Sequence, residues 1–290
     1  MKNLLLRIIN DKSPVLTVTQ NDHLRRLIWQ EKYKKTLKKF IVISNDEPIN
    51  KESNFVFSLW FQGFENAPKI VKQCKERVAA YCSSNGKEFV ELDENNLFDY
   101  VDLPETIITK WKNGVISNAA FSDICRVSLL TKYGGLWLDS TVYLTDKIDE
   151  EILESEVFVY QASPLDFSST KISNWLMFSK YPQNRLIRSL YLTMLNFYEK
   201  NKKIGDYFIF HLFFSLLINE GELKRDFESI PFISNTYPHQ LMKVLNKSYN
   251  EAEFQRIKDK SNIHKLTYKE LDEGIPGTFY KKIVARELEE

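Results

Sequence analysis

Short apolar runs alternate with longer helical patterns between residue 55 and about residue 180. The runs have the length of buried strands and cover residues 55–61, 88–92, 136–144, 157–161 and 174–178. Apolar positions at helical spacing predict helices that start at Pro68, Pro104 and Ser117, and two longer helices near 183–200 and 206–219. This alternation favours an α/β fold with an open sheet, in which ligands bind beyond the carboxyl ends of the strands. That rule selects two segments, Trp60–Gly63 and Asp139–Thr141.

The first 53 residues have a different character. Residues 22–39 carry seven Lys or Arg side chains and two acids, and residues 44–53 are polar with Pro48 among them. We therefore expect a basic helical N-terminal arm and linker over residues 1–53, followed by an α/β domain with a helical C-terminal part over 54–290. The basic stretch 25–39 either lies on an anionic membrane surface or forms a solvated helix face.

Composition narrows the function classes. The 40 Lys and Arg residues are balanced by 39 Asp and Glu residues, which argues against a nucleic-acid partner. The three cysteines are too few for a disulfide scaffold and indicate buried thiols in a reducing compartment. No cleavable signal is evident, and the longest apolar stretch, 207–218, is too short to span a bilayer. We expect a cytoplasmic protein.

Candidate functional residues are concentrated in residues 122–141, whose sequence is SDICRVSLLTKYGGLWLDST. Asp123 and Arg126 share one helix face, two glycines end that helix, and a short strand delivers Asp139 to its carboxyl end. These charges suit a divalent cation and an anionic substrate. The alternative is a surface ion pair beside an Asp in a turn.

This run resembles the sugar-nucleotide signature SD-x-x-R…YGG-x-W-x-D of the retaining glycosyltransferases of family 32, and most of all their capsular polysaccharide synthesis branch. The large clostridial glucosylating toxins share a similar block. LWFQGFENAPKIVKQC, SNWLMFS, GDYFIFH and SNIHKLTYK also resemble segments of the family, so the likeness covers roughly residues 54–270. The resemblance implies a GT-A-like, Rossmann-type mixed sheet with a helical N-terminal arm and a helical C-terminal subdomain.

The resemblance also implies a divalent metal, Mn²⁺ or Mg²⁺, that neutralises the diphosphate of the donor. Its expected ligands are Asp139, Thr141 and His264. Thr141 stands where a full DxD motif has its second carboxylate, which leaves the identity of the metal open. Lys265 is expected to neutralise phosphate charge, while His264 either binds metal or phosphate or is a structural histidine.

The remaining roles follow from the same resemblance. Trp60 is expected to stack on uracil, or else to be a core residue. Asp123 and Arg126 would bind the hydroxyls of the donor sugar, and Asn174 would lie beside it. The full donor-binding set is Trp60, Gln62, Gly63, Ser122, Ser140 and Lys265. Asp206 and His211 either line the acceptor cleft or serve as a helix cap and a buried histidine.

The function implied is transfer of a hexose from UDP-galactose or UDP-glucose to a capsule or surface-polysaccharide repeat unit carried on a lipid, with retention of configuration. No carboxylate stands out as a covalent nucleophile, which favours attack on the face that the diphosphate leaves. Thr141 keeps an alternative open, a catalytically inactive sugar-nucleotide or glycan-binding module. A secreted glycosylating toxin is a third and weaker reading.

Overall fold

A central sheet of five strands, in the order β2-β1-β3-β6-β5, organises the protein. We describe it from a computed structural model that covers residues 31, 33–163, 170–201, 207–219 and 223–287. The strands of this sheet are β1 (Phe55–Leu59), β2 (Glu88–Leu92), β3 (Gly135–Leu138), β5 (Val157–Gln161) and β6 (Ile172–Ser179). A second sheet pairs β4 (Val142–Leu144) with β7 (Ile263–Lys265). The predicted mixed α/β fold is confirmed.

The strand order places a change of direction at β1. This strand runs parallel to both β2 and β3, whereas β6 is antiparallel to β3 and to β5. The chain therefore passes from β1 to β2 on one side of β1, and the next connection crosses back past β1 to reach β3 on its other side. Between β1 and β3 the carboxyl ends of two parallel strands open onto a crevice, the position where open α/β sheets bind ligands.

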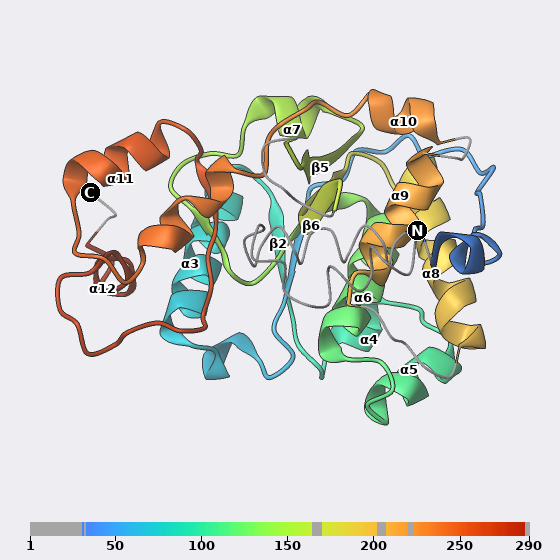
Figure 1. The fold of residues 1–290 in the computed structure, drawn as a ribbon, viewed down its shortest axis with the longest axis horizontal. Helices are drawn as coiled ribbons and strands as arrows, with labels where there is room; N and C mark the ends of the chain where they lie inside the picture. Colours follow the sequence, from blue (N-terminus) through green and yellow to red (C-terminus); the bar gives the residue numbers. More distant parts are fainter. Residues whose placement is uncertain (1–30, 32, 164–169, 202–206, 220–222, 288–290) are drawn as a thin grey trace, which may run out of the picture.

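Helices cover both sides of the central sheet (Figure 1). In this view α3 lies on the left with α11 and α12, and α6, α8 and α9 lie on the right. The α-helices are α3 (Lys69–Ser84), α4 (Leu97–Tyr100), α5 (Glu105–Lys112), α6 (Asn118–Tyr133), α7 (Glu150–Glu154), α8 (Arg185–Lys200), α9 (Ile209–Asn219), α10 (Lys224–Glu228), α11 (Glu251–Lys258) and α12 (Phe279–Val284). The short 3-10 helices are η1 (Phe64–Asn66), η3 (Tyr237–His239) and η4 (Leu241–Val244).

The local signals in the sequence predict most of these elements. Strands β2 and β5 coincide with the predicted runs, and the Ser117 hydroxyl accepts from the Ala120 N–H to cap α6 as expected. One prediction is wrong, a single strand over residues 136–144. The Val142 N–H donates to the carbonyl of Asp139, so the chain turns between β3 and β4, and β4 leaves the central sheet to pair with β7.

The glycine pair between α6 and β3 is required by the geometry. Gly134 and Gly135 have φ angles of 67° and 88°, in the left-handed region that favours glycine. A Cβ atom on Gly135 would lie 2.4 Å from the backbone oxygen of Phe55. The close approach lets β3 pair with β1 immediately after α6 ends.

The end of the predicted N-terminal arm packs against α8. Residues 33–38 are helical, and Leu37 and Phe40 are buried in the main core. The Phe40 ring meets Phe197 edge to face at 5.2 Å, and the Ser44 N–H donates to the Ser189 hydroxyl. Part of the stretch suggested to contact a membrane, residues 25–30 and 32, lies outside the described residues. Within the part that is described, no helix is both long and apolar enough to cross a bilayer.

Candidate active site

A cavity of about 400 Å³ opens where β1 and β3 end, at the point where the strand order changes direction. This volume is typical of small-molecule sites. Its walls come from the segment after β1, from the first half of α6, from the turn after β3, and from later parts of the chain. The lining residues are Leu59, Trp60, Phe61, Gln62, Asn118, Ala119, Ser122, Asp123, Arg126, Trp137, Asp139, Ser140, Thr141, Asn174, Tyr207, His211, Lys265 and Tyr268.

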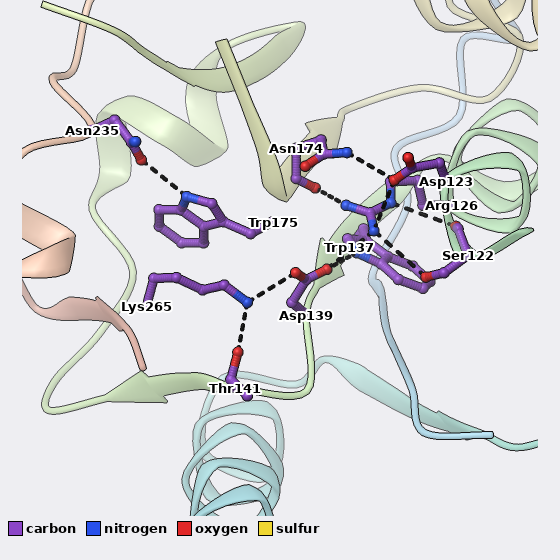
Figure 2. Close-up of polar contacts among 10 residues, drawn as sticks. All are labelled: Ser122, Asp123, Arg126, Trp137, Asp139, Thr141, Asn174, Trp175, Asn235 and Lys265. Atoms are coloured by element: carbon purple, nitrogen blue, oxygen red, sulfur yellow. Dashed lines mark hydrogen bonds and ion pairs between the residues drawn. The ribbon is translucent and has the colours of Figure 1, made fainter. Parts of the chain in front are cut away.

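Asp139 lies at the centre of the polar wall, between two cations. Its Oδ2 is 2.9 Å from the Lys265 ammonium, and its Oδ1 is 3.3 Å from the Arg126 guanidinium (Figure 2). The indole N–H of Trp137 also donates to Oδ1, and the Asp139 backbone N–H donates to the carbonyl of Trp175. The carboxylate is therefore held in a fixed orientation at the mouth of the strand crevice.

Arg126 connects the two carboxylates of the site. Its guanidinium contacts Oδ1 of Asp123 at 3.2 Å as well as Asp139, and it donates to the backbone oxygens of Ser122 and Asn174. The side chain is only 6% exposed, so these contacts are made in a poorly solvated place where they are strong. The Asn174 amide donates to the same Asp123 oxygen at 2.8 Å. Both contacts of Asp123 fall on Oδ1, which orients its carboxyl group.

The two carboxyl groups have different proton affinities. Burial raises the pKa of Asp123 to about 7; the Asp139 charge adds to this effect, and Arg126 and the Asn174 hydrogen bond oppose it. Burial also opposes ionisation of Asp139. There, however, the charges of Lys265 and Arg126 and the hydrogen bonds from Lys265 and Trp137 outweigh it and lower the pKa below its usual value. Asp139 is therefore an anion near neutrality, whereas Asp123 is poised to change its protonation state.

His264 and Lys265, the two residues of β7 that were expected in the site, face in opposite directions. Lys265 points into the cavity and donates to the Thr141 hydroxyl at 2.5 Å. His264 follows the alternation of β7 to the other side, where it is fully buried and its Nε2 lies 3.1 Å from the Thr145 hydroxyl. Burial and the nearby Lys258 lower the pKa of His264 to about 3. The expectation that His264 contributes to the site is corrected, because strand pairing turns its ring away from the cavity.

Comparison with known proteins assigns the chain to a protein family. A sequence profile described as "Capsular polysaccharide synthesis protein" matches residues 9–283. The chain belongs to this family. A search of the solved structures finds the chain similar to "PaToxG Glycosyltransferase", with 13% identity over 85% of this chain and 98% of that chain and a TM-score of 0.39. No curated protein matches the chain.

The side chains of the cavity do not fit the expected metal site. In the part of the chain that the structure describes, no group of three or more His, Cys, Asp or Glu side chains lies together in a way that could hold a metal ion. Asp139 offers one carboxylate and Thr141 a neutral hydroxyl, and the Lys265 ammonium already contacts both. A divalent cation on these two oxygens would have to displace a like charge. We therefore derive no step of the chemistry through a metal.

The segment after β1 contributes an aromatic wall to the site. Trp60 and Gln62 line the cavity, and the Trp60 indole meets the ring of Tyr268 edge to face at 5.2 Å. Gly63 is outside the cavity wall. Its φ of 79° and the hydrogen bond from its N–H to the Trp60 carbonyl show that it closes the turn after β1.

Several lining residues were not singled out by the sequence, among them the aromatic residues Trp137, Tyr207 and Tyr268. The position of Trp137 can be predicted from the sequence. It lies two residues before Asp139 on a strand, so both side chains face the same side. Tyr207 and Tyr268 have no comparable signal, because their positions depend on how distant segments pack. His211 does line the cavity, whereas Asp206, its suggested partner, lies outside the described residues.

Proposed function

We propose that this protein is a retaining glycosyltransferase of the GT-A type that transfers a hexose from UDP-galactose or UDP-glucose. The observation that supports this most is the cluster of Asp123, Arg126, Asp139 and Lys265 inside a cavity at the strand switch point. Open α/β sheets bind nucleotides at this place. Family membership supplies the polysaccharide context of the reaction.

The cavity wall divides into regions that suit the parts of a sugar nucleotide. Trp60 offers an aromatic face to a base, and the turn of Asp139, Ser140 and Thr141, with Lys265 beside it, suits the diphosphate and ribose. Asp123 and Asn174, one on α6 and the other on β6, suit the hydroxyl groups of the hexose. Arg126 is a positioning residue in this arrangement, because its contacts are with protein groups on both sides.

The reaction that fits this arrangement is attack on the face from which the diphosphate leaves. The bond between C1 of the hexose and the diphosphate oxygen breaks, and a bond between C1 and the acceptor oxygen forms on the same face. The proton of the acceptor hydroxyl passes to the departing diphosphate oxygen. The Lys265 ammonium, fixed beside Asp139, stabilises the negative charge that develops on the diphosphate.

Two exposed aromatic rings also line the cavity, and one of them, Tyr268, lies beside Trp60. Tyr207 is 74% exposed and Tyr268 is 42% exposed, and both line the cavity. Such rings pack against the apolar faces of sugars, as expected for a lipid-linked oligosaccharide acceptor at the cytoplasmic face of a membrane. Lys35 and Lys38 are exposed near the N-terminal end of the described chain and suit an anionic lipid surface, whereas Leu37 between them is turned into the core.

A panel of UDP-hexoses, scored by release of UDP with and without Mn²⁺, tests the proposal. Turnover of UDP-galactose or UDP-glucose by the wild type, and its loss in Asp139→Asn, is the expected result. Binding of UDP-hexoses without release of UDP in the presence of capsule-type acceptors would instead favour the inactive binding module. Absence of both binding and turnover for every donor would refute the proposed function.

A further inference from the structure

We propose that the ammonium of Lys265 is the resident cation of the diphosphate subsite, so that the nucleotide diphosphate binds to this protein without a divalent metal. The inference rests on the proposed function and deepens it. The position of the ammonium carries the argument: it lies 2.9 Å from Oδ2 of Asp139 and 2.5 Å from Oγ1 of Thr141. These two side-chain oxygens, at the first and third positions of the turn, are the ones that the sequence offers to a metal, and Lys265 contacts both (Figure 2).

The charged part of the wall consists of two carboxyl groups and two cations. Asp123 and Asp139 face the cavity together with Arg126 and Lys265. Arg126 is 6% exposed and lies between the two carboxylates, and it also contacts the backbone oxygens of Ser122 and Asn174. Its charge is therefore committed to the protein, and a diphosphate that enters the cavity must find its counter-charge elsewhere.

Lys265 is more accessible to a ligand than Arg126. An ammonium has three N–H donors, and its hydrogen bonds within the described chain, to Asp139 and Thr141, use two of them. Its side chain is 20% exposed, more than three times the exposed fraction of Arg126. A phosphate oxygen can therefore take the third donor while the lysine keeps its two protein contacts.

Strand pairing makes this position rigid. In the β4–β7 ladder Lys265 is paired with Val142, the residue that follows Thr141. The Leu266 N–H donates to the Thr141 carbonyl at 2.9 Å. The ammonium is thus held on the same turn that carries Asp139. A preorganised charge of this kind needs little rearrangement when the leaving group becomes negative.

Thr141 fits the same interpretation. A carboxylate at this position would add a second negative charge and favour a divalent ion over an ammonium. A hydroxyl is neutral and accepts one hydrogen bond from Lys265, so Asp139, Thr141 and Lys265 together carry no net charge in the absence of ligand.

Calorimetric titration of UDP in EDTA, and again in excess MnCl₂ or MgCl₂, tests the inference. We expect wild-type protein to bind UDP in EDTA, with a Kd that the metals change by less than about threefold. We expect Lys265→Met to weaken UDP binding in EDTA by about thirtyfold or more, since the lost partner is a poorly solvated charge. Lys265→Arg, which keeps the charge, should lose less than about tenfold.

Two controls separate a role at the phosphates from a general loss of structure. Uridine has no phosphate, so its affinity for Lys265→Met should stay within about threefold of that for the wild type. Lys132→Met removes a comparable ion pair with Asp102 outside the cavity and should leave UDP binding unchanged. Thermal unfolding monitors the fold of each variant, and the wild-type comparison with EDTA remains decisive even where a variant does not fold.

The outcomes distinguish the inference from the proposed function. If Mn²⁺ or Mg²⁺ tightens wild-type UDP binding by more than about tenfold, or if folded Lys265→Met binds UDP in EDTA like the wild type, the inference is overturned while the glycosyltransferase assignment stands. If the wild type does not bind UDP under any of these conditions, the donor assignment fails and the inference falls with it.

Discussion

The Lys265 ammonium lies 2.9 Å from the Asp139 carboxylate, although 126 positions separate the two residues in the sequence. The contact exists because β7 pairs with β4 in a register that sets Lys265 opposite Val142. Since side chains alternate along a strand, a slip of one residue would turn Lys265 away and bring His264 or Leu266 to the cavity. The charge of the site therefore depends on the pairing of two three-residue strands.

Replacement of Asp139 by Asn tests the central carboxylate. The amide keeps the shape of the side chain but removes the charge that faces Lys265 and Arg126, so we expect turnover to fall by about a hundredfold or more. The fold should survive, because the site is at the end of a strand. Release of UDP from the donor measures the loss, and thermal unfolding checks the fold. A variant with nearly wild-type turnover would contradict the assignment.

Replacement of Arg126 by Lys tests its positioning role. A lysine cannot contact Asp123 and Asp139 together while donating to the Ser122 and Asn174 carbonyls. We expect kcat to fall by about a hundredfold while the Kd for UDP changes by less than about threefold, because the sugar-facing carboxyl group is disordered and the phosphate side is kept. Arg256→Lys, at an exposed pair with Glu253, is the matched control. A folded Arg126→Lys protein that no longer binds UDP would show that the roles are reversed.

Replacement of Asp123 by Asn should change how stability depends on pH. Burial, reinforced by Asp139 and opposed by Arg126 and Asn174, raises the pKa of Asp123 from 3.8 to about 7, so the folded protein holds a proton that the unfolded chain has already lost. This contribution to stability is full below about pH 4 and is lost as the pH rises through 7. The free energy of unfolding of the wild type should therefore fall relative to that of Asp123→Asn as the pH rises across this range. The fall should reach up to about 4 kcal/mol, since one pKa unit corresponds to about 1.4 kcal/mol.

Urea unfolding at several pH values between 4 and 8 measures this effect. Asp102→Asn changes an exposed carboxyl group and serves as the control for the general loss of negative charge. A constant difference between wild type and Asp123→Asn over the whole range would mean that Asp123 is ionised in the folded protein at every pH tested.

Replacement of Gly135 by Ala should destabilise the sheet. The new Cβ would lie 2.4 Å from the Phe55 carbonyl oxygen, at a φ of 88° that alanine rarely adopts. We expect a loss of about 3 kcal/mol or more in the free energy of unfolding. Gly86→Ala shares the positive φ but has open space around the Cβ, and should cost only about 1–2 kcal/mol. Equal losses in the two variants would show that the contact with Phe55 relaxes without cost.

Ser140 is the residue expected to tune the choice of donor. It lines the cavity between Asp139 and Thr141, the turn that we propose to hold the diphosphate of the donor. Glucose and galactose differ in the orientation of one hydroxyl group, and one hydrogen bond or clash shifts such a choice by about 1–3 kcal/mol. We expect Ser140→Ala or Ser140→Thr to change the ratio of kcat/KM for UDP-glucose and UDP-galactose by more than about fivefold. An unchanged ratio in both variants would show that Ser140 does not select the donor and serves only in the turn.

Local patterns in the sequence predict much of the secondary structure of this protein and part of its site. Apolar runs and helical spacing depend on near neighbours in the chain, so they predicted β2 and β5 residue for residue and placed the cap of α6 at Ser117. The paired glycines required a tight approach, and the structure shows it at Phe55. The carboxyl-end rule, applied to the strands, led to Trp60 and Asp139, which line one cavity.

The tertiary structure decided how distant residues meet. Two neighbours in the sequence, His264 and Lys265, look equally suited to the site, and only the pairing of β7 with β4 turns one into the core and the other toward Asp139. The break between β3 and β4 has the same origin, because an apolar run does not show which sheet each half will join. Strand register and packing of remote segments depend on contacts across the whole chain, which no local pattern contains.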